Sequence, residues 1–226
     1  MLLIALTMIY PFWYVLSYSL SDMSMTGGNR LLLWPRGFSL DSYTVAFSNA
    51  TILHGFFISA ARSVIGPFLM LVVSGMAAYA VSKNELVGVK WFRRFLFFSM
   101  YVSAGLLPSY LLIRTLGLTG TFWVYVIPGV ANVFNIVLIR AYIETLPAGL
   151  EESAMIDGAT YFTVFSRIVL PLCVPVIAAV TLYACVGQWN SFIDAQLYNY
   201  RNPELYPVQY LLYNYIAEKA PTKEAS

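Results

Sequence analysis

The chain has 226 residues, of which 59% are hydrophobic and 11% are charged, and its formal net charge is +2. Soluble domains carry about a quarter charged residues, so water is not the main solvent of this chain. So small a net charge is not typical of nucleic-acid binding, and the cations are better interpreted through membrane topology. The composition therefore predicts an integral membrane protein.

Five apolar runs follow one another along the chain, each about long enough to cross roughly 30 Å of hydrocarbon as a helix. They lie at about residues 1–21, 60–82, 95–113, 121–140 and 168–188. The first run has the length of a signal peptide, but it lacks a basic flank and more apolar runs follow it, which favours a retained helix. The sequence predicts an all-α membrane protein with about five transmembrane helices.

The segment between the first two runs, from Asp22 to about His54, is polar and interrupted by glycine and proline. We expect an outer loop here, with a short surface helix that starts near residues 39–43. His54 is the only histidine of the chain. Without a second His, Cys or carboxylate at ligand spacing, it is interpreted as an interfacial polar residue, and no metal site is predicted.

The densest group of cations lies in the loop 83–94, between the second and third runs. These cations are Lys83, Lys90, Arg93 and Arg94. The positive-inside rule places this loop in the cytoplasm, and counting the spans places the loop 144–167 on the same side. The core of the second run, Ser63 to Ser82, is uncharged, and we expect the same of the other runs.

Residues 151–171 form a polar island between the last two apolar runs. Glu151 and Glu152 lie favourably near the positive end of a predicted short helix. A turn at Gly158 ends that helix, since glycine accepts the left-handed conformation, and Thr160 can cap the next helix through its side-chain oxygen. Two helices that meet at such a bend indicate a docking surface at the edge of the bilayer.

This island resembles the EAA loop of bacterial ABC importer permeases, whose pattern is Glu-Ala-Ala, three residues, Gly, nine residues and Ile-x-Leu-Pro. The residues that match in register are Glu152-Ser153-Ala154, Gly158, Ile168, Leu170 and Pro171. Asp157 and Ala159 extend the match to the Asp-Gly-Ala form usual in the carbohydrate-uptake branch, and Ser153 is the one departure. An ordinary amphipathic loop with an Asp-Gly turn is the alternative, and a match of this length favours the family.

The resemblance implies a permease subunit of an ATP-driven bacterial importer for oligosaccharides. It implies a single transmembrane domain over residues 1–226, in which the loop 144–167 contains a coupling helix that contacts an ATPase. The implied coupling residues are Glu151, Glu152, Ala154, Asp157, Gly158 and Ala159. The family usually has a sixth transmembrane helix, and no apolar run remains after Leu212 to supply it, so we expect a chain truncated at its C-terminal end.

The resemblance also implies partners in the bacterial plasma membrane and on both sides of it. They are a second permease subunit, two ATPase subunits and an extracellular solute-binding lipoprotein, which would deliver sugar to the outer segments Asp22–His54 and Ser191–Ser226. The chain has no phosphate-binding Gly-x-x-x-x-Gly-Lys-Ser/Thr, so ATP is expected to bind the partner ATPase and no cofactor to bind here. No motif identifies the sugar.

Amide and aromatic side chains mark a candidate substrate path. Asn132 and Asn135 fall within the fourth run, and Gln188, Trp189 and Asn190 end the fifth. Irregular helices with polar groups suit a cavity lining, while Trp faces stack on sugar rings and amides bond hydroxyls. Hydrogen bonds between helices and an interfacial tryptophan belt explain the same residues equally well.

Two other classes of membrane protein compete with this interpretation. A secondary transporter would need an intramembrane charge to bind its coupling ion, and a membrane-embedded enzyme would need paired acids or metal ligands at membrane depth. The uncharged cores of the runs supply neither, so we expect no enzyme. Cys173 and Cys185 lie about three turns apart in one run and cannot pair with each other.

Overall fold

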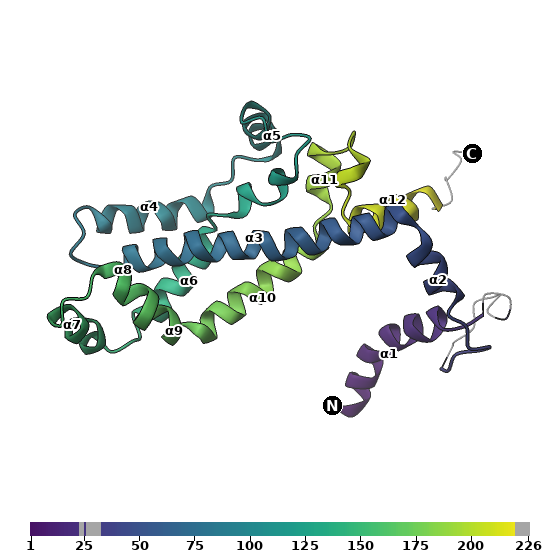
Figure 1. Cartoon of the computed structure of the whole chain (residues 1–226), viewed down its shortest axis with the longest axis horizontal. Coiled ribbons are helices and arrows are strands. Elements are labelled where there is room, and N and C mark those ends of the chain that lie inside the picture. The colour runs from purple at the N-terminus through teal and green to yellow at the C-terminus, as the bar shows by residue number, and fades with distance from the viewer. Residues whose placement is uncertain (23–24, 26–32, 220–226) are drawn as a thin grey trace. The chain divides into compact units, whose positions relative to one another are not determined.

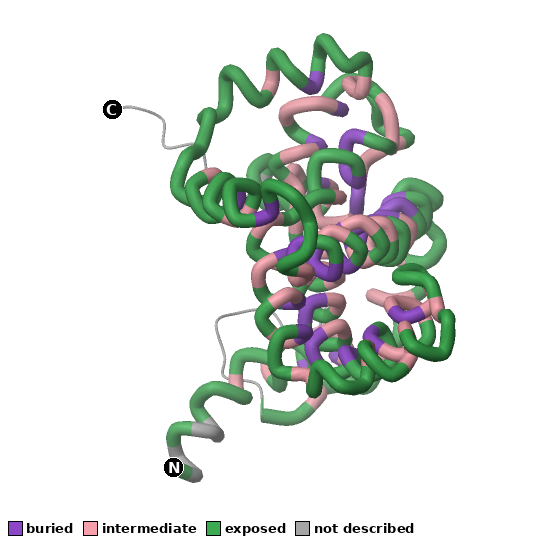
Figure 2. Tube along the Cα trace, turned by 90° about the vertical axis from the view of Figure 1, so that its left-hand side faces the viewer, coloured by how far each residue is buried: buried purple, intermediate pink, exposed green. Residues whose placement is uncertain are grey.

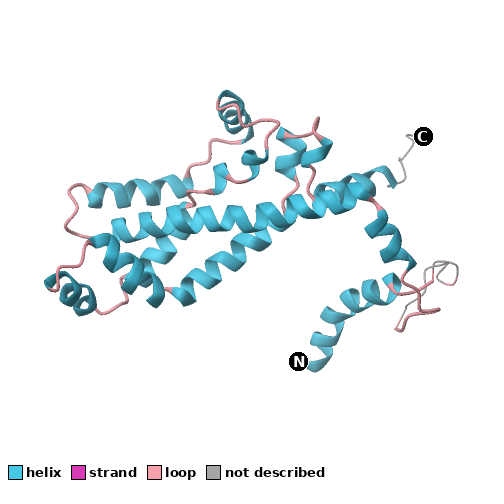
Figure 3. Ribbon diagram, in the orientation of Figure 1, coloured by secondary structure: helices cyan, strands magenta, loops and turns pink. Residues whose placement is uncertain are grey.

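The computed structural model describes residues 1–22, 25 and 33–219. These residues form helices and loops (Figure 3). One isolated antiparallel bridge joins Ser21 and Phe38. The predicted all-α class is therefore confirmed. The chain divides into two compact units, Met1–His54 and Gly55–Ser226, and each is described by itself.

The helices carry the labels of Figure 1. In chain order they are α1 (Leu2–Ser19), α2 (Asp41–Ser48), α3 (Ala50–Ser82), α4 (Val89–Tyr101), α5 (Leu106–Thr115), η1 (Phe122–Tyr125), η2 (Ile127–Gly129), α6 (Val133–Ile143), α7 (Ala148–Ile156), α8 (Tyr161–Val164), η3 (Phe165–Val169), α9 (Leu170–Leu172), α10 (Val174–Asn190), α11 (Ile193–Tyr198), η4 (Pro203–Leu205) and α12 (Val208–Lys219). The segment η3 is a π-helix, and the other η segments are 3-10 helices.

In the first unit, the segment after α1 folds back onto the end of that helix. The backbone N–H of Asp22 donates to the carbonyl of Gly37 at 2.9 Å, and the indole N–H of Trp13 donates to the carbonyl of Leu33 at 2.7 Å. The surface helix expected near residues 39–43 is α2. The described part of the predicted outer loop is thus tied to α1 by hydrogen bonds.

The longest helix, α3, has 33 residues and is the one described helix that is long and apolar enough to cross a membrane unaided. It begins at Ala50 and not near residue 60, because apolar residues continue the helix through the segment assigned to the loop. The stretch Ser63–Ser82 is uncharged, but the helix extends beyond it and includes Arg62, which is only 1% exposed. Pro67 also lies inside α3 and is buried.

The core of the second unit is formed by aliphatic side chains of α3, α4, α6, the α8–η3 segment and α10. Ser74 and Ala78 of α3 are fully buried, and such small residues let neighbouring helices approach closely. Figure 1 shows α4 and α10 beside α3, and Figure 2 shows buried segments where the helices meet. Representative core residues are Met70, Val81, Leu96, Ile139, Val164 and Val180.

The end of the described chain packs on the opposite end of α3. The backbone N–H of Val208 donates to the hydroxyl of Ser59 at 2.9 Å, and the hydroxyl of Tyr125 donates to the carbonyl of Leu205 at 2.7 Å. A side chain at Gly55 would lie 2.6 Å from Leu211, so this glycine permits the close contact between α3 and α12. Residues 193–219 are therefore anchored to the bundle and do not form a loose outer loop.

Three further candidate membrane crossings are bent helix pairs. The pair α4 and α5 bends by 117°, η1–η2 and α6 by 44°, and α8–α9 and α10 by 78°. Gly105, with φ +80°, permits the sharp turn before α5. Each pair is either a broken span or a re-entrant loop, so the described residues contain between one and four candidate spans. The predicted five spans stay a prediction.

The C-terminal end of α3 is capped by a side chain from α4. The guanidinium of Arg93 donates to the carbonyls of Val81 (2.8 Å) and Ser82 (3.0 Å) and to the amide oxygen of Asn84 (2.9 Å). The last carbonyls of a helix lack partners within the helix, and a cation there also complements the dipole. Arg93 thus fixes the corner between α3 and α4.

We predict that Arg93→Gln lowers the free energy of unfolding by about 2 kcal/mol, because it removes charge-assisted hydrogen bonds from the end of α3. The matched control is Arg114→Gln, which removes an exposed cation at the end of α5. Thermal unfolding of the purified protein in detergent, followed by tryptophan fluorescence, measures both. Equal shifts for the two variants would show that Arg93 has no capping role.

Candidate functional site

The short helix predicted in the polar island is α7, and the turn expected after it is present. Gly158 has φ +83°, a left-handed conformation that strains any residue with a side chain. Its N–H donates to the carbonyl of Met155, and the N–H of Ala159 donates to the carbonyl of Ala154, both at 3.0 Å. These bonds satisfy carbonyls at the end of α7 and fix the direction in which the chain leaves it.

Thr160 begins the next helical segment, as expected for a capping residue. Its hydroxyl oxygen accepts a hydrogen bond from the backbone N–H of Thr163 at 3.3 Å. The chain then continues through α8, the π-helix η3 and α9 into α10. The polar island therefore leads into α10, the longest of the described helices that follow α3 in the chain.

Glu151 faces the bundle and joins α7 to the end of α3. Its carboxylate forms an ion pair with Lys83 and accepts a hydrogen bond of 3.3 Å from the hydroxyl of Tyr79. The ammonium of Lys83 also lies 4.4 Å from the centroid of the Tyr79 ring. A second connection runs from the hydroxyl of Tyr161 to the carboxylate of Glu85 at 2.7 Å. Glu151 thus ties α7 to Tyr79 of α3 and to Lys83 just beyond it, and Tyr161 ties α8 to the loop that follows α3.

The other residues predicted for coupling divide into two groups. Ala154 and Ala159 are partly buried and pack against the core, whereas Glu152, Asp157 and Gly158 are exposed. A cleft of about 400 Å³ lies beside α7 and is lined by both glutamates of the helix and by the end of α3. Three of the six residues thus lie in α7 and three in the turn directly after it, and the segment has a buried side and an exposed side.

A polar cavity of about 570 Å³ lies farther along the bundle, among α3, η1–η2, α6, α10 and α11. Its polar lining includes Asn132, Asn135, Gln188, Arg62, Asp194 and Tyr198. Three of the five residues predicted for a substrate path therefore converge there. Trp189 instead packs edge-on against Phe56, with the ring centroids 5.3 Å apart, and Asn190 is the exposed last residue of α10.

The two asparagines also have local structural roles. The side-chain oxygen of Asn132 accepts the backbone N–H of Asn135 at 3.1 Å and so caps α6. The amide of Asn135 donates to the sulfur of Met70 on α3 at 3.3 Å. Asn135 thus makes a hydrogen bond between helices, whereas the bond of Asn132 lies within the start of its own helix, and both residues also line the cavity.

Arg62 is the centre of a buried network at one wall of this cavity. Its guanidinium forms an ion pair with Asp194 and donates to the side chain of Gln188 at 2.9 Å and to the carbonyl of Ser191 at 3.3 Å. The guanidinium also lies 4.3 Å from the centroid of the Tyr125 ring. Gln188 in turn donates to the carbonyl of Tyr125 at 3.0 Å. The network joins α3, η1, α10 and α11.

Most of the hydrogen-bond donors of Arg62 are used within the protein, and its charge is balanced by Asp194. The cavity therefore presents amide and hydroxyl groups and no free cation from this network. Gly66, one turn along α3, makes room for it, because a Cβ there would lie 3.1 Å from Nε2 of Gln188. The arrangement can hold neutral polar groups by hydrogen bonds.

Sequence reasoning missed Arg62 and Asp194 as site residues. Arg62 had a usable signal, a single charge between apolar residues on both sides, but the predicted second run was considered only from Ser63 onward. Asp194 had no comparable signal, because it follows the fifth run within an evidently polar stretch. Only the fold of α11 against α3 reveals the pair.

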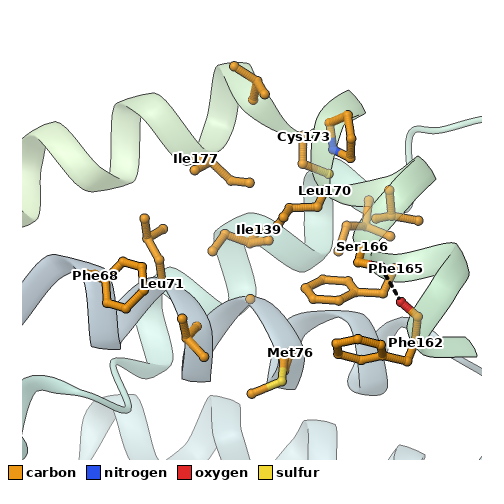
Figure 4. Close-up of a pocket in the computed structure, with 16 residues that line it drawn as sticks. Phe68, Leu71, Met76, Ile139, Phe162, Phe165, Ser166, Leu170, Cys173 and Ile177 are labelled. Carbon is orange, nitrogen blue, oxygen red and sulfur yellow. Dashed lines mark hydrogen bonds between the residues drawn. The ribbon is translucent and has the colours of Figure 1, made fainter.

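An apolar groove of about 700 Å³ lies between α3 and the α8–α10 segment (Figure 4). Phe68, Met76, Phe162, Phe165 and the free Cys173 are among its lining residues. The hydroxyl of Ser166, labelled in the figure, donates to the carbonyl of Phe162 at 2.8 Å. Its lining is almost wholly apolar, so no polar chemistry is assigned to it.

The second unit is a helical bundle that has a polar helix tied to the end of its longest helix and a polar cavity farther along. Residues 1–199 match the family described as "Binding-protein-dependent transport system inner membrane component". The chain belongs to this family. The prediction of an ABC transporter permease that is not an enzyme is confirmed, and so is a membrane location.

Two relatives from Bacillus subtilis (strain 168) are similar over most of the chain. The polygalacturonan/rhamnogalacturonan transport system permease protein YtcP is 33% identical over 94% of this chain and 74% of its own length. Protein LplC is 37% identical over 84% of this chain and 64% of its own length. The chain thus spans about two thirds to three quarters of these proteins.

A solved structure has the same fold. It is the crystal structure of a bacterial ABC transporter involved in the import of the acidic polysaccharide alginate. One of its chains superposes with a TM-score of 0.87 at 28% identity, covering 98% of this chain and 79% of that chain. The helices described here therefore have the arrangement of an ABC transporter permease.

We predict that Arg62→Met lowers the free energy of unfolding by about 3–5 kcal/mol, because it leaves the carboxylate of Asp194 without its partner. The matched control is Arg114→Met, which changes an exposed arginine at the end of α5 and should have little effect. Thermal unfolding in detergent measures both variants. Removing both charges with Asp194→Leu should recover part of the loss, and no recovery would contradict the pairing.

We predict that Lys83 and Glu151 are energetically coupled by about 1 kcal/mol, the range of a partly exposed ion pair. A double-mutant cycle with Lys83→Gln and Glu151→Gln, measured by thermal unfolding, gives this value. The reversed pair, Lys83→Glu with Glu151→Lys, should regain part of the stability that either single reversal loses. Additive effects throughout the cycle would show that the contact does not hold α7 on α3.

Proposed function

We propose that this chain is the permease subunit of an ATP-driven bacterial importer for oligosaccharides. The observation that carries the proposal is α7, which lies within the EAA-type spacing, is followed by the left-handed turn at Gly158 and is joined to α3 through Glu151, in a chain of the transport family. The relative that transports polygalacturonan/rhamnogalacturonan and the structure involved in alginate import support sugar polymers as the substrate class.

The outer face of α7 is the proposed contact with the ATPase. Glu152, Asp157 and Gly158 are exposed and lie on or next to one short helix, beside a cleft that a partner can approach. The inner face holds the helix in place through Glu151 and the two partly buried alanines. A helix with one face free and one face fixed can pass a displacement of its partner to the bundle as a rigid-body movement.

The connection from α7 to the substrate path runs through α3. Lys83 lies just past the end of this helix and Arg62 lies within it, about 30 Å away at 1.5 Å per residue. Movement of α7 therefore acts on the same helix that carries one wall of the polar cavity. In this proposal ATP binds and is hydrolysed in the partner subunits, and this chain converts their movement into opening and closing of the path.

The polar cavity is the proposed contact with sugar. Amide groups of Asn132, Asn135 and Gln188 can form hydrogen bonds with sugar hydroxyls there. Tyr198 adds an aromatic ring to the lining, and this ring is held in place by stacking on Tyr110, with the centroids 5.7 Å apart. Trp189 and Asn190 lie outside this cavity wall. Their predicted role is retained only as a contact at the end of α10.

The remaining parts of the proposal concern topology and partners. The loops 83–94 and 144–167 face the cytoplasm, where two ATPase subunits bind. A second permease completes the path, and an extracellular binding lipoprotein delivers sugar to segments 22–54 and 191–226. The positive-inside rule and the family support this arrangement.

We predict that Gly158→Leu uncouples the transporter, because the left-handed conformation strains any other residue by about 1–2 kcal/mol and the docking face changes direction. The structure has no atom within 4 Å of a Cβ at this glycine, so the effect is conformational and not a clash within the chain. Sugar uptake should fall about tenfold or more. The matched control is Gly149→Ala in α7, where the backbone is ordinary and the added carbon meets no neighbour.

The function is tested with the full-length permease, its sister permease, the ATPase subunits and the binding protein in liposomes. Uptake of labelled galacturonan and alginate oligosaccharides should require ATP on the side of the membrane where the ATPase subunits lie. It should continue when an ionophore removes the ion gradient. Uptake that continues without the ATPase but stops with the ionophore would favour a secondary transporter. In such a transporter, the charged pair Arg62 and Asp194 would bind the coupling ion. The response to the ionophore therefore separates the two classes.

A further inference from the structure

The N-terminal half of α4 is unusually basic. Lys90, Arg93 and Arg94 lie within its first two turns, and the chain contains no Asp or Glu between Glu85 and Glu144. The helix has no acidic residue in its first turn and no side-chain cap. Cations near the positive end of a helix dipole are unfavourable unless a negative charge compensates them.

The three cations have different surroundings. Arg93 is used to cap α3, as described above. Lys90 and Arg94 are exposed, and within the described residues neither takes part in an ion pair. Glu85, the carboxylate nearest in sequence, accepts a hydrogen bond from Tyr161. Within the described residues no carboxylate pairs with Lys90 or Arg94, so both cations are available to a bound anion.

The outward face of α4 combines these cations with exposed aromatic side chains. Val89 and Leu96 are buried on the side that packs on the bundle, whereas Trp91, Phe95 and Phe98 are 74%, 64% and 68% exposed. The guanidinium of Arg94 lies 5.3 Å from the centroid of the Trp91 ring. Along this face, the turn that carries Lys90, Trp91 and Arg94 is followed directly by a turn that carries Phe95 and Phe98.

We propose that Lys90, Trp91 and Arg94 form a binding site for the phosphate headgroup of an anionic phospholipid. The two cations indicate that the ligand is an anion. The exposed Phe95 and Phe98 in the next turns indicate that this anion carries acyl chains. Trp is favoured at the boundary between headgroups and hydrocarbon, and basic residues there attract anionic lipids. The site depends on the membrane location of the family and not on the substrate or on the ATPase contact.

The lipid stabilises the corner between α3 and α4 from outside, as Arg93 does from inside. It neutralises the two cations at the start of α4 and covers the aromatic face that the chain itself leaves exposed. A free phosphate ion would satisfy the cations but leave this apolar face uncovered, so the site discriminates between the two sources of phosphate.

The test is a titration of the full-length permease, assembled with its partners in detergent, with dioleoyl-phosphatidylglycerol or dioleoyl-phosphatidylcholine, followed by native mass spectrometry. Wild type should bind phosphatidylglycerol more tightly than phosphatidylcholine. Replacing each cation should weaken binding of phosphatidylglycerol roughly fivefold, so Lys90→Gln with Arg94→Gln should weaken it about twenty-fivefold and leave binding of phosphatidylcholine unchanged. Arg114→Gln, an exposed arginine on α5, is the matched control and should change neither.

Three results would overturn the proposal. One is an unchanged preference for phosphatidylglycerol in the double variant, and another is an equal loss in Arg114→Gln, which would indicate a general charge effect. The third is release of the sister permease or the ATPase with the lipid preference intact, which would make this face a protein interface. If the double variant does not fold, a salt titration of wild type decides, since added salt should weaken only the binding of phosphatidylglycerol.

Discussion

The buried guanidinium of Arg62 is the constraint on which the second unit depends. A charge taken out of water into a helical bundle is tolerated only when a counter-charge and hydrogen-bond acceptors surround it. Here they come from the end of α10, the segment after it and the start of α11, with the ring of Tyr125 on another side. Elements far apart in sequence must therefore meet at one place on α3, and the polar cavity is the space that remains between them.

The two polar contacts of α3 differ in how many groups hold the cation, and this difference fits a helix that moves at one end. Around Arg62 the donors are largely used and the guanidinium is almost completely enclosed. Around Lys83 the ion pair with Glu151 is partly exposed, with side-chain exposures of 18% and 17%, and water competes for it. The end that contacts α7 can thus rearrange at low cost, while the end beside the cavity keeps its partners.

Much of this architecture could be predicted from the sequence because it depends on local chemistry. The all-α class follows from composition, and the turn at Gly158 and the cap at Thr160 follow from residue conformations that few other side chains share. The start of α3 was misplaced because isolated polar residues such as His54 do not stop a helix that packs along its length. The partners of Arg62 could not be found, since a contact across more than a hundred residues leaves no pattern in a single sequence.

Pro67 creates a point within the long helix α3 at which the helix can bend. A proline within a helix removes one backbone hydrogen bond and its ring crowds the preceding turn, so the helix is weakest over residues 63–67. That segment includes Gly66, which packs on Gln188, and it directly follows Arg62. A displacement of α3 near Lys83 can therefore be taken up by bending of the helix at residues 63–67. The wall of the polar cavity would then change its shape while Arg62 keeps its hydrogen bonds and its ion pair with Asp194.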